Sequence, residues 1–364
     1  MRIGLIAPPF ISVPPKVYGG TELFVGHLAE GLTSKGIEVV VYANGESNVS
    51  CELKFLYPKA QWPLTGEIFS NMKDVNHTSW AMADAARDCD IIHINNAPGL
   101  ANSRFVDLPF VYTIHHPHED GLSDFYSYYP QVQYVTISDF QQSLEAMPKM
   151  RTIHHGILMH QYQLREKKQQ YLSFIGRLAP VKAPHLAIEV AKKTGIPLKI
   201  AGEIQPLFES YYESEIKPHI DGKFIEFVGE ADLAAKNELL GNSLAMLFPI
   251  QWNEPFGLVM IEAMACGTPV IALRAGSVPE VVQNGVSGYI CADVNEMAER
   301  VKNLDVPPAR VRTYAEENFS VDVMVAKYID LYTEIYAGRT ELALDLATAA
   351  QDGPELATLP GAAA

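Results

Sequence analysis

Residues 253–271 read NEPFGLVMIEAMACGTPVI, and their pattern is the strongest indication of the architecture. A short apolar run at 244–248 precedes them, and a second apolar run occupies 269–273. Pro255 and Gly257 suit a tight entry into a helix, which we expect over 256–266. A strand, a helix and a second strand in this order form a βαβ unit, whose strands lie parallel in one sheet.

The same alternation of short apolar runs and helical patterns fills both halves of the chain, and a polar stretch at 161–170 separates them. It predicts an α/β protein with two Rossmann-like, doubly wound parallel-sheet domains that face each other. We expect domains at 1–160 and 161–318, a helix at 319–340, and a flexible tail at 341–364. The predicted strands are 3–7, 38–42, 91–94, 110–114 and 134–137 in the first half, and 171–175, 198–201, 224–228, 244–248 and 269–273 in the second.

Composition narrows the classes of function. The 364 residues are 48% hydrophobic and carry a formal charge of −15, which argues against a nucleic-acid partner because such proteins need a basic face. The four cysteines are not closely spaced, so no metal or disulfide framework is expected. No signal sequence or transmembrane run is evident, and we predict a cytoplasmic protein. Peripheral membrane contact and the oligomeric state stay open.

Two acidic residues flank the start of the helix expected at 256–266. Glu254 precedes it, and Glu262 lies about one and a half turns inside it, roughly 9 Å along the axis from the helix start at about 1.5 Å per residue. The first-turn amides of Gly257, Leu258 and Val259 would be free donors at the positive end of the helix dipole. The two carboxylates could grip hydroxyls of one elongated ligand; alternatively, Glu254 only complements the helix dipole and Glu262 is solvated.

Two basic residues lie where the first strand of the second domain turns into a helix, in the stretch FIGRLAPVKA at 174–183. Arg177 and Lys182 could neutralise a diphosphate and so provide the cationic pocket that an anionic substrate of this acidic protein needs. Taken alone, they could also be ordinary surface charges.

The first domain offers a glycine pair and a histidine. Gly19 and Gly20 follow the first strand, where backbone amides can approach a ligand closely. His115 follows the strand at 110–114, at the carboxyl end where sites of parallel sheets form. Neighbouring histidines could suggest a metal cluster, but no Cys or acidic spacing completes one, and we expect no metal site.

The segment with Glu254 and Glu262 resembles the E-x7-E region of the retaining GT-B glycosyltransferases of glycosyltransferase family 4, and 174–183 matches their G-R-L-x-x-x-K pattern. The resemblance implies that 1–160 is the acceptor-side domain, that 161–318 binds the nucleotide-sugar donor, and that the helix at 319–340 crosses back to the first domain. It implies catalytic roles for His115, Arg177, Lys182 and Glu254. The donor-binding residues that it implies are Gly19, Gly20, Gly202, Glu230, Phe256, Gly257, Leu258, Val259 and Glu262.

The activity implied by the resemblance is transfer of a hexose, with retention, from a nucleotide-diphosphate sugar to a hydroxyl of a saccharide, lipid or small molecule. UDP-glucose is the first choice of donor and GDP-mannose the second. Neither a metal nor another cofactor is expected to be required. The alternatives are a non-catalytic nucleotide-sugar binding protein and a GT-B nucleotide-sugar epimerase.

The sequence departs from the family at the crossing between domains, where His154-His155-Gly156 replaces the usual Pro-Asn-Gly. A second distracting feature is Asp88-Cys89-Asp90, which imitates a D-x-D metal motif. Because it directly precedes a predicted buried strand, we interpret it as structural.

Overall fold

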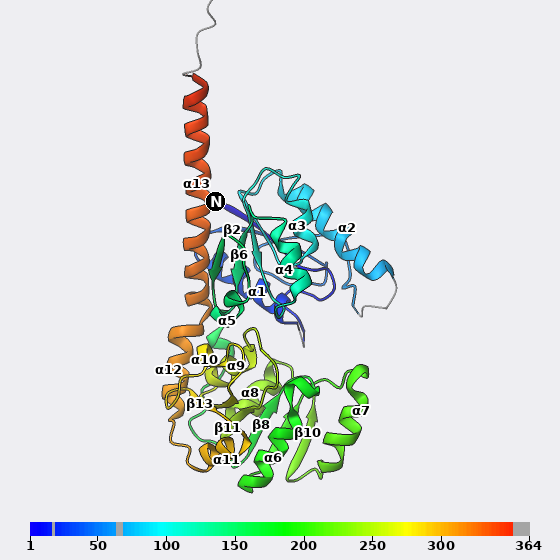
Figure 1. Cartoon of the computed structure of the whole chain (residues 1–364), viewed down its shortest axis with the longest axis vertical. Helices are drawn as coiled ribbons and strands as arrows, with labels where there is room; N and C mark the ends of the chain where they lie inside the picture. The colour runs from blue at the N-terminus through cyan, green and yellow to red at the C-terminus, as the bar shows by residue number, and fades with distance from the viewer. Residues whose placement is uncertain (17–18, 63–67, 352–364) are drawn as a thin grey trace, which may run out of the picture.

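The computed structural model describes residues 1–16, 19–62 and 68–351, which form two lobes stacked end to end (Figure 1). Each lobe is built on its own parallel sheet, with helices on both faces. This confirms the predicted fold class of two doubly wound α/β domains.

The sheet of the first lobe has seven strands in the order β3-β2-β1-β4-β5-β6-β7. All neighbouring strands are parallel, and Ile3 of β1 is opposite Val39 of β2 and Ile91 of β4. The order reverses beside β1, which makes the β1/β4 boundary the switch point of this lobe. The strands are β1 (Arg2–Ile6), β2 (Glu38–Ala43), β3 (Glu52–Phe55), β4 (Ile91–Ile94), β5 (Phe110–Thr113), β6 (Gln133–Thr136) and β7 (Met150–Thr152).

Helices of the first lobe cover both faces of this sheet, because its central strands are apolar on both sides. Ile3 and Leu5 pack with α1, whereas Ile6 and Tyr42 pack on the opposite face with residues of α2. The helices of this lobe are α1 (Gly20–Ser34), α2 (Ile68–Ala85), α3 (Pro98–Asn102), α4 (Asp120–Ser127) and α5 (Asp139–Ser143).

The second sheet has six parallel strands in the order β10-β9-β8-β11-β12-β13, so its switch point lies between β8 and β11. Its strands are β8 (Leu172–Ile175), β9 (Leu198–Ala201), β10 (Ile225–Gly229), β11 (Ala245–Phe248), β12 (Val270–Leu273) and β13 (Gly288–Cys291). Its α-helices are α6 (Pro184–Thr194), α7 (Glu209–Tyr211), α8 (Leu233–Asn242), α9 (Leu258–Ala265), α10 (Val278–Val281), α11 (Val294–Lys302) and α12 (Pro308–Phe319).

The chain crosses between the lobes twice, and the two crossings are bonded to each other. Ile157 on the outward crossing exchanges backbone hydrogen bonds with Phe319 and Val321 on the return. Arg312 of α12 braces the same region, since its guanidinium donates to the carbonyls of Met159 and Tyr162. The lobes therefore meet at a double, hydrogen-bonded crossing and not at a single flexible strand.

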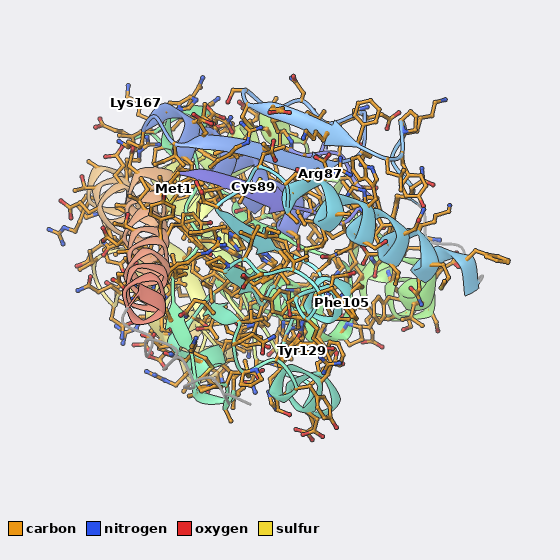
Figure 2. All side chains as sticks on the ribbon, turned by 90° about the horizontal axis from the view of Figure 1, so that it is seen from above. Met1, Arg87, Cys89, Phe105, Tyr129 and Lys167 are labelled. Atoms are coloured by element: carbon orange, nitrogen blue, oxygen red, sulfur yellow. The ribbon has the colours of Figure 1, made fainter. Side chains whose placement is uncertain are left out.

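The last helix, α13 (Val321–Gln351), begins at the return crossing and runs along the first lobe (Figure 1). Its buried residues Met324, Val325 and Tyr328 join the core formed by β1 and α1. Figure 2 looks down on the first lobe and shows α13 nearly along its axis at one margin. The helix continues past residue 341, where the sequence predicted a flexible tail, because this Ala-rich stretch consists of good helix formers. Residues 352–364 lie outside the described residues.

The Asp88-Cys89-Asp90 motif lies at the amino end of the first sheet. Asp90 accepts a hydrogen bond from the Arg2 amide at 2.7 Å, and Asp88 forms an ion pair with the Arg2 side chain at 3.4 Å. Cys89 is buried beside Gly4 of β1 (Figure 2 labels this cysteine). The motif has the structural role that we expected of it.

Candidate functional site

The residues singled out from the sequence follow the strands that flank the two switch points. Gly19 caps α1 at the end of the loop from β1, Gly20 is the first residue of α1, and His115 comes two residues after β5. In the second lobe, Arg177 follows β8 and Glu254 lies between β11 and α9. Ligands of doubly wound sheets bind at the carboxyl ends of the strands beside such points.

Lys182 and Glu254 form a buried ion pair at the second switch point. The ammonium of Lys182 contacts Glu254 Oε2, and the Trp252 indole donates a second hydrogen bond to the same oxygen at 2.8 Å. The Lys182 ammonium also lies 4.8 Å from the centre of the Trp252 ring. A backbone hydrogen bond from Gln251 to Val181 at 2.8 Å ties the two loops together. Two segments more than 70 residues apart thus present one compact polar group.

Arg177 adds a positive charge that no carboxylate of the described residues neutralises. Its Nε is buried without a hydrogen-bond partner in the part of the chain that the structure describes. Burial lowers the pKa of Lys182, and the charge of Arg177 acts in the same direction, whereas Glu254 raises it. Two cations and one carboxylate leave this group with a net positive charge. This group is a candidate for the cationic pocket that an anionic substrate of an acidic protein would need.

The amino end of α9 lies next to this ion pair. Gly257 caps the helix with φ 80°, in the left-handed region, and a Cβ there would lie 3.3 Å from Glu254 Cγ. No side chain caps the helix, and the Leu258 and Val259 amides have no acceptor among the described residues. A Cβ on Gly20 of the first lobe would lie 3.9 Å from the Leu258 side chain. The glycine loop of one lobe therefore faces the free helix end of the other.

Glu262 is buried and held by two partners. Its Oε1 accepts hydrogen bonds from the Tyr162 hydroxyl and the Lys236 ammonium, both at 2.9 Å. The side chain is only 3% exposed, so the alternative of a solvated Glu262 is wrong. Its second oxygen, Oε2, makes no hydrogen bond to a described residue. A carboxylate fixed in this way offers one oriented acceptor.

His115 carries a defined proton on one ring nitrogen. The Asn95 amide is oriented by its bond to the Ile6 carbonyl at 3.1 Å, so its Oδ1 faces His115 Nε2 at 2.9 Å. An oxygen can only accept, and Nε2 must therefore be protonated. Burial lowers the pKa of His115 well below its usual value, which leaves Nδ1 as an unprotonated acceptor. That atom is buried without a hydrogen-bond partner among the described residues, and it could accept a hydrogen bond from a hydroxyl group.

The remaining residues predicted for the donor site differ in their placement. Gly202 follows β9 with φ 153°, and a Cβ there would lie 1.8 Å from the Gly176 carbonyl oxygen, so it supports the turn that carries Arg177. The Phe256 side chain is buried between the rings of His155 and Phe319, at 5.2 and 6.0 Å, and belongs to the core. Glu230 is exposed after β10 and makes no contact with the ion pair.

The sequence reasoning missed four residues of this region, which are Tyr162, Lys236, Trp252 and Glu22. Trp252 and Lys236 each bond one of the two glutamates, and neither belongs to a motif that was recognised. Glu22, in the first turn of α1, is 6% exposed, and burial raises its pKa to about 7. It lies beside Gly19, since a Cβ on that glycine would lie 2.9 Å from Glu22 Oε2. Its position three residues after the helix cap could have indicated it.

Comparison with known proteins shows the family of the chain. Residues 158–305 match the family model of glycosyl transferases group 1, and residues 18–145 match that of glycosyltransferase family 4. N-acetyl-alpha-D-glucosaminyl L-malate synthase of Bacillus anthracis is 36% identical over 126 residues, which are 32% of this chain and 32% of that protein. Glycogen synthase of Mycobacterium tuberculosis is 26% identical over 373 residues, covering 86% of this chain and 88% of that protein.

Solved glycosyltransferase structures are similar to this chain in fold. The structure of Anabaena HepE in complex with UDP and glucose superposes with a TM-score of 0.72 at 16% identity, covering 92% of this chain and 100% of that chain. Among the described residues, no helix is both long and apolar enough to cross a membrane. The two family models together span most of both lobes, and the chain therefore belongs to the group 1, family 4 type of glycosyltransferases with the GT-B fold.

Proposed function

We propose that this protein transfers a hexose from a nucleotide-diphosphate sugar to a hydroxyl acceptor, with retention of the anomeric configuration. The observation that carries the proposal is the unneutralised Arg177 beside the buried Lys182–Glu254 pair. A group with two cations and one carboxylate suits a ligand that brings both a diphosphate and sugar hydroxyls.

The chemical requirement is stabilisation of the departing nucleoside diphosphate. Arg177, Lys182 and the free amides at the start of α9 provide fixed positive charge and donors for this purpose. Such an arrangement can take the place of a divalent ion at the leaving group. We therefore propose that the reaction does not require a metal.

Donor binding would redistribute the partners of the ion pair. A diphosphate competes with Glu254 for the Lys182 ammonium, and the released carboxylate can accept hydrogen bonds from the hydroxyls of the donor sugar. The Trp252 indole still donates to Glu254 and holds it in place. Glu262, with one oxygen free, would accept from the ribose hydroxyls.

The first lobe would complete the site. His115 Nδ1 is an available acceptor for a sugar hydroxyl, and the Gly19-Gly20 loop lies against the first turn of α9. UDP-glucose is our first choice of donor and GDP-mannose the second. The similarity in fold to a protein that was solved with UDP and glucose supports this order.

The proposal is tested in two steps. A thermal-shift series with UDP, GDP and their sugars identifies the base, and transfer assays follow with the stabilising donor and a panel of hydroxyl acceptors, with and without EDTA. Proton NMR of the product gives the anomeric configuration. We expect a retained configuration, turnover in EDTA, and loss of turnover in Glu254→Gln.

Each alternative has its own outcome. Donor binding without transfer or hydrolysis, unchanged by Glu254→Gln, would favour a binding protein. A new sugar nucleotide formed without any acceptor would favour an epimerase. An inverted product would contradict the proposed stereochemistry.

A further inference from the structure

Glu280 links the two lobes through a contact that neither sequence motif covers. This residue lies in α10 of the second lobe, and its carboxylate reaches α5 of the first. Oε2 accepts a hydrogen bond from the Asp139 amide and Oε1 one from the Phe140 amide, both at 2.7 Å. These amides belong to the first turn of α5, where a helix has no acceptors of its own. Glu280 therefore provides hydrogen-bond acceptors for two amides of the opposite lobe that would otherwise be unpaired.

A third bond joins Glu280 to the crossing between the lobes. His154 Nε2 lies 3.0 Å from Glu280 Oε2, and the His154 ring packs on Phe256 at 5.8 Å. The side chains of His154 and Glu280 are 21% and 18% exposed. Asp139, His154 and Glu280 lie close together, but both oxygens of Glu280 accept bonds from backbone amides and the Asp139 side chain is exposed. Hydrogen bonding therefore explains this cluster, and we do not interpret it as a metal site.

The backbone that leads into α10 packs directly on the residue that we place at the donor sugar. The Ser277 amide donates to the Glu254 carbonyl at 3.0 Å, and the Ser277 hydroxyl donates to the Phe256 carbonyl at 2.9 Å. A Cβ on Gly276 would lie 2.4 Å from the Glu254 carbonyl oxygen, so the backbones of the two segments pack tightly against each other. Glu280 is the third residue after Ser277, and its amide donates to the Ser277 carbonyl at 2.9 Å.

We propose that Glu280 is a positioning residue, which fixes the orientation of the two lobes and transmits it through Ser277 to the Glu254 loop. The inference rests on the proposed function for its catalytic consequence but not for its structural one. When the Glu280 contact is made, Glu254 and the start of α9 are held opposite the first lobe, where an acceptor would bind. When it is broken, the second lobe keeps its donor-binding residues but loses their alignment with the first lobe.

The test compares Glu280→Gln with Asp293→Asn. Asp293 is the control for removing the charge of an acidic helix cap within one lobe, since its Oδ1 accepts the amides of Asn295 at 2.7 Å and Glu296 at 2.9 Å. A glutamine can accept through only one oxygen and turns its own amide donors toward the second N–H group. Losing hydrogen bonds to a charged acceptor should raise exchange of the Asp139 and Phe140 amides about tenfold to a hundredfold in hydrogen–deuterium exchange. The control should leave these amides unchanged.

Two further measurements test the transmission to Glu254. In a background with Trp62→Phe and Trp80→Phe, Glu280→Gln should shift the fluorescence of Trp252, whose indole bonds Glu254, while Asp293→Asn should not. Transfer should fall at least tenfold in kcat, whereas the affinity for the nucleoside diphosphate should change less than twofold. Glu280→Asp, which keeps the charge but shortens the side chain, should show the same pattern more weakly if the glutamine variant does not fold.

The outcomes separate this inference from the proposed function. Wild-type exchange rates at 139–140 in Glu280→Gln, or Trp252 fluorescence that responds equally in both variants, would overturn the positioning role. Failure of the wild-type protein to turn over any donor would refute the proposed function, while exchange and fluorescence would still decide whether Glu280 links the lobes.

Discussion

Removing one partner of the Lys182–Glu254 pair should destabilise the protein far more than removing both. The side chains are 15% and 11% exposed, so each single change leaves a largely desolvated charge without its partner. Such losses typically cost about 3–5 kcal/mol in fully buried pairs. Trp252 still donates to position 254, and Lys182 can lose its proton, so we expect about 2–4 kcal/mol for Glu254→Gln or Lys182→Met.

The double variant Glu254→Gln/Lys182→Met should recover to within about 1 kcal/mol of the wild-type protein, because no unpaired charge is left. Urea denaturation of the four proteins at one pH gives the coupling energy. The exposed pair between Arg151 and Glu334, with N–O distance 2.7 Å, is the control and should couple by less than about 1 kcal/mol.

The pH dependence of Glu254→Gln gives an internal check. Burial already lowers the pKa of Lys182, and loss of Glu254 should lower it further. Between this lowered pKa and the ordinary lysine pKa, the unfolded state binds more protons than the native state. The stability deficit of Glu254→Gln relative to the wild-type protein should therefore shrink as the pH rises toward the ordinary lysine pKa.

Single-variant effects on the unfolding free energy that add within about 0.5 kcal/mol would refute the coupling of Lys182 and Glu254. All three variants should lose transfer activity, and the double variant should regain stability but not activity.

Two further substitutions probe the surroundings of the site. The folded-state pKa of Glu22 is raised to about 7, so its favourable contribution is present below about pH 4.5 and is lost as the pH rises through 7. Glu22→Gln should therefore match the wild-type protein at pH 4 and exceed its unfolding free energy by about 1–3 kcal/mol at pH 8; parallel stability profiles would contradict this. Gly202→Ala should lower the melting temperature and abolish donor binding, because its Cβ would lie 1.8 Å from the Gly176 carbonyl oxygen. Gly121→Ala, where a Cβ meets nothing within 4 Å, should leave both measurements unchanged.

Most buried strands could be predicted because their apolar runs are continuous. Three strands were missed, and all of them lie at sheet edges. β3 (Glu52–Phe55) is charged and half exposed, β7 (Met150–Thr152) has three residues, and β13 (Gly288–Cys291) begins with glycine. An edge strand is buried on fewer sides, so its sequence carries a weaker pattern.

The site was predictable where a residue belongs to a local motif and not where a partner comes from elsewhere in the chain. Arg177, Lys182 and Glu254 were singled out because they belong to local motifs that resemble those of the family, and the structure brings Lys182 and Glu254 into contact. Lys236, which bonds Glu262, and Glu280, which bonds α5, depend on pairings between elements. No local pattern distinguishes such residues from solvated charges on a helix.

Phe256 shows that a residue inside a recognised motif can still point away from the candidate site. The family resemblance implied a donor contact for Phe256, but its side chain is buried in a hydrophobic core, where it packs on His155. A motif places the backbone of each residue correctly, whereas the direction of a side chain depends on how the neighbouring helix packs.

The most direct test of the donor site is a calorimetric titration of UDP, and of GDP in parallel, into the wild-type protein and Arg177→Ala. Arg177 has no carboxylate partner among the described residues, so its loss should not reduce stability but should weaken binding of the preferred diphosphate at least tenfold. Arg300→Ala removes an exposed cation of the same lobe and should bind as the wild type does. Failure of the folded wild-type protein to bind either nucleotide, or equal affinity in Arg177→Ala, would contradict the assignment.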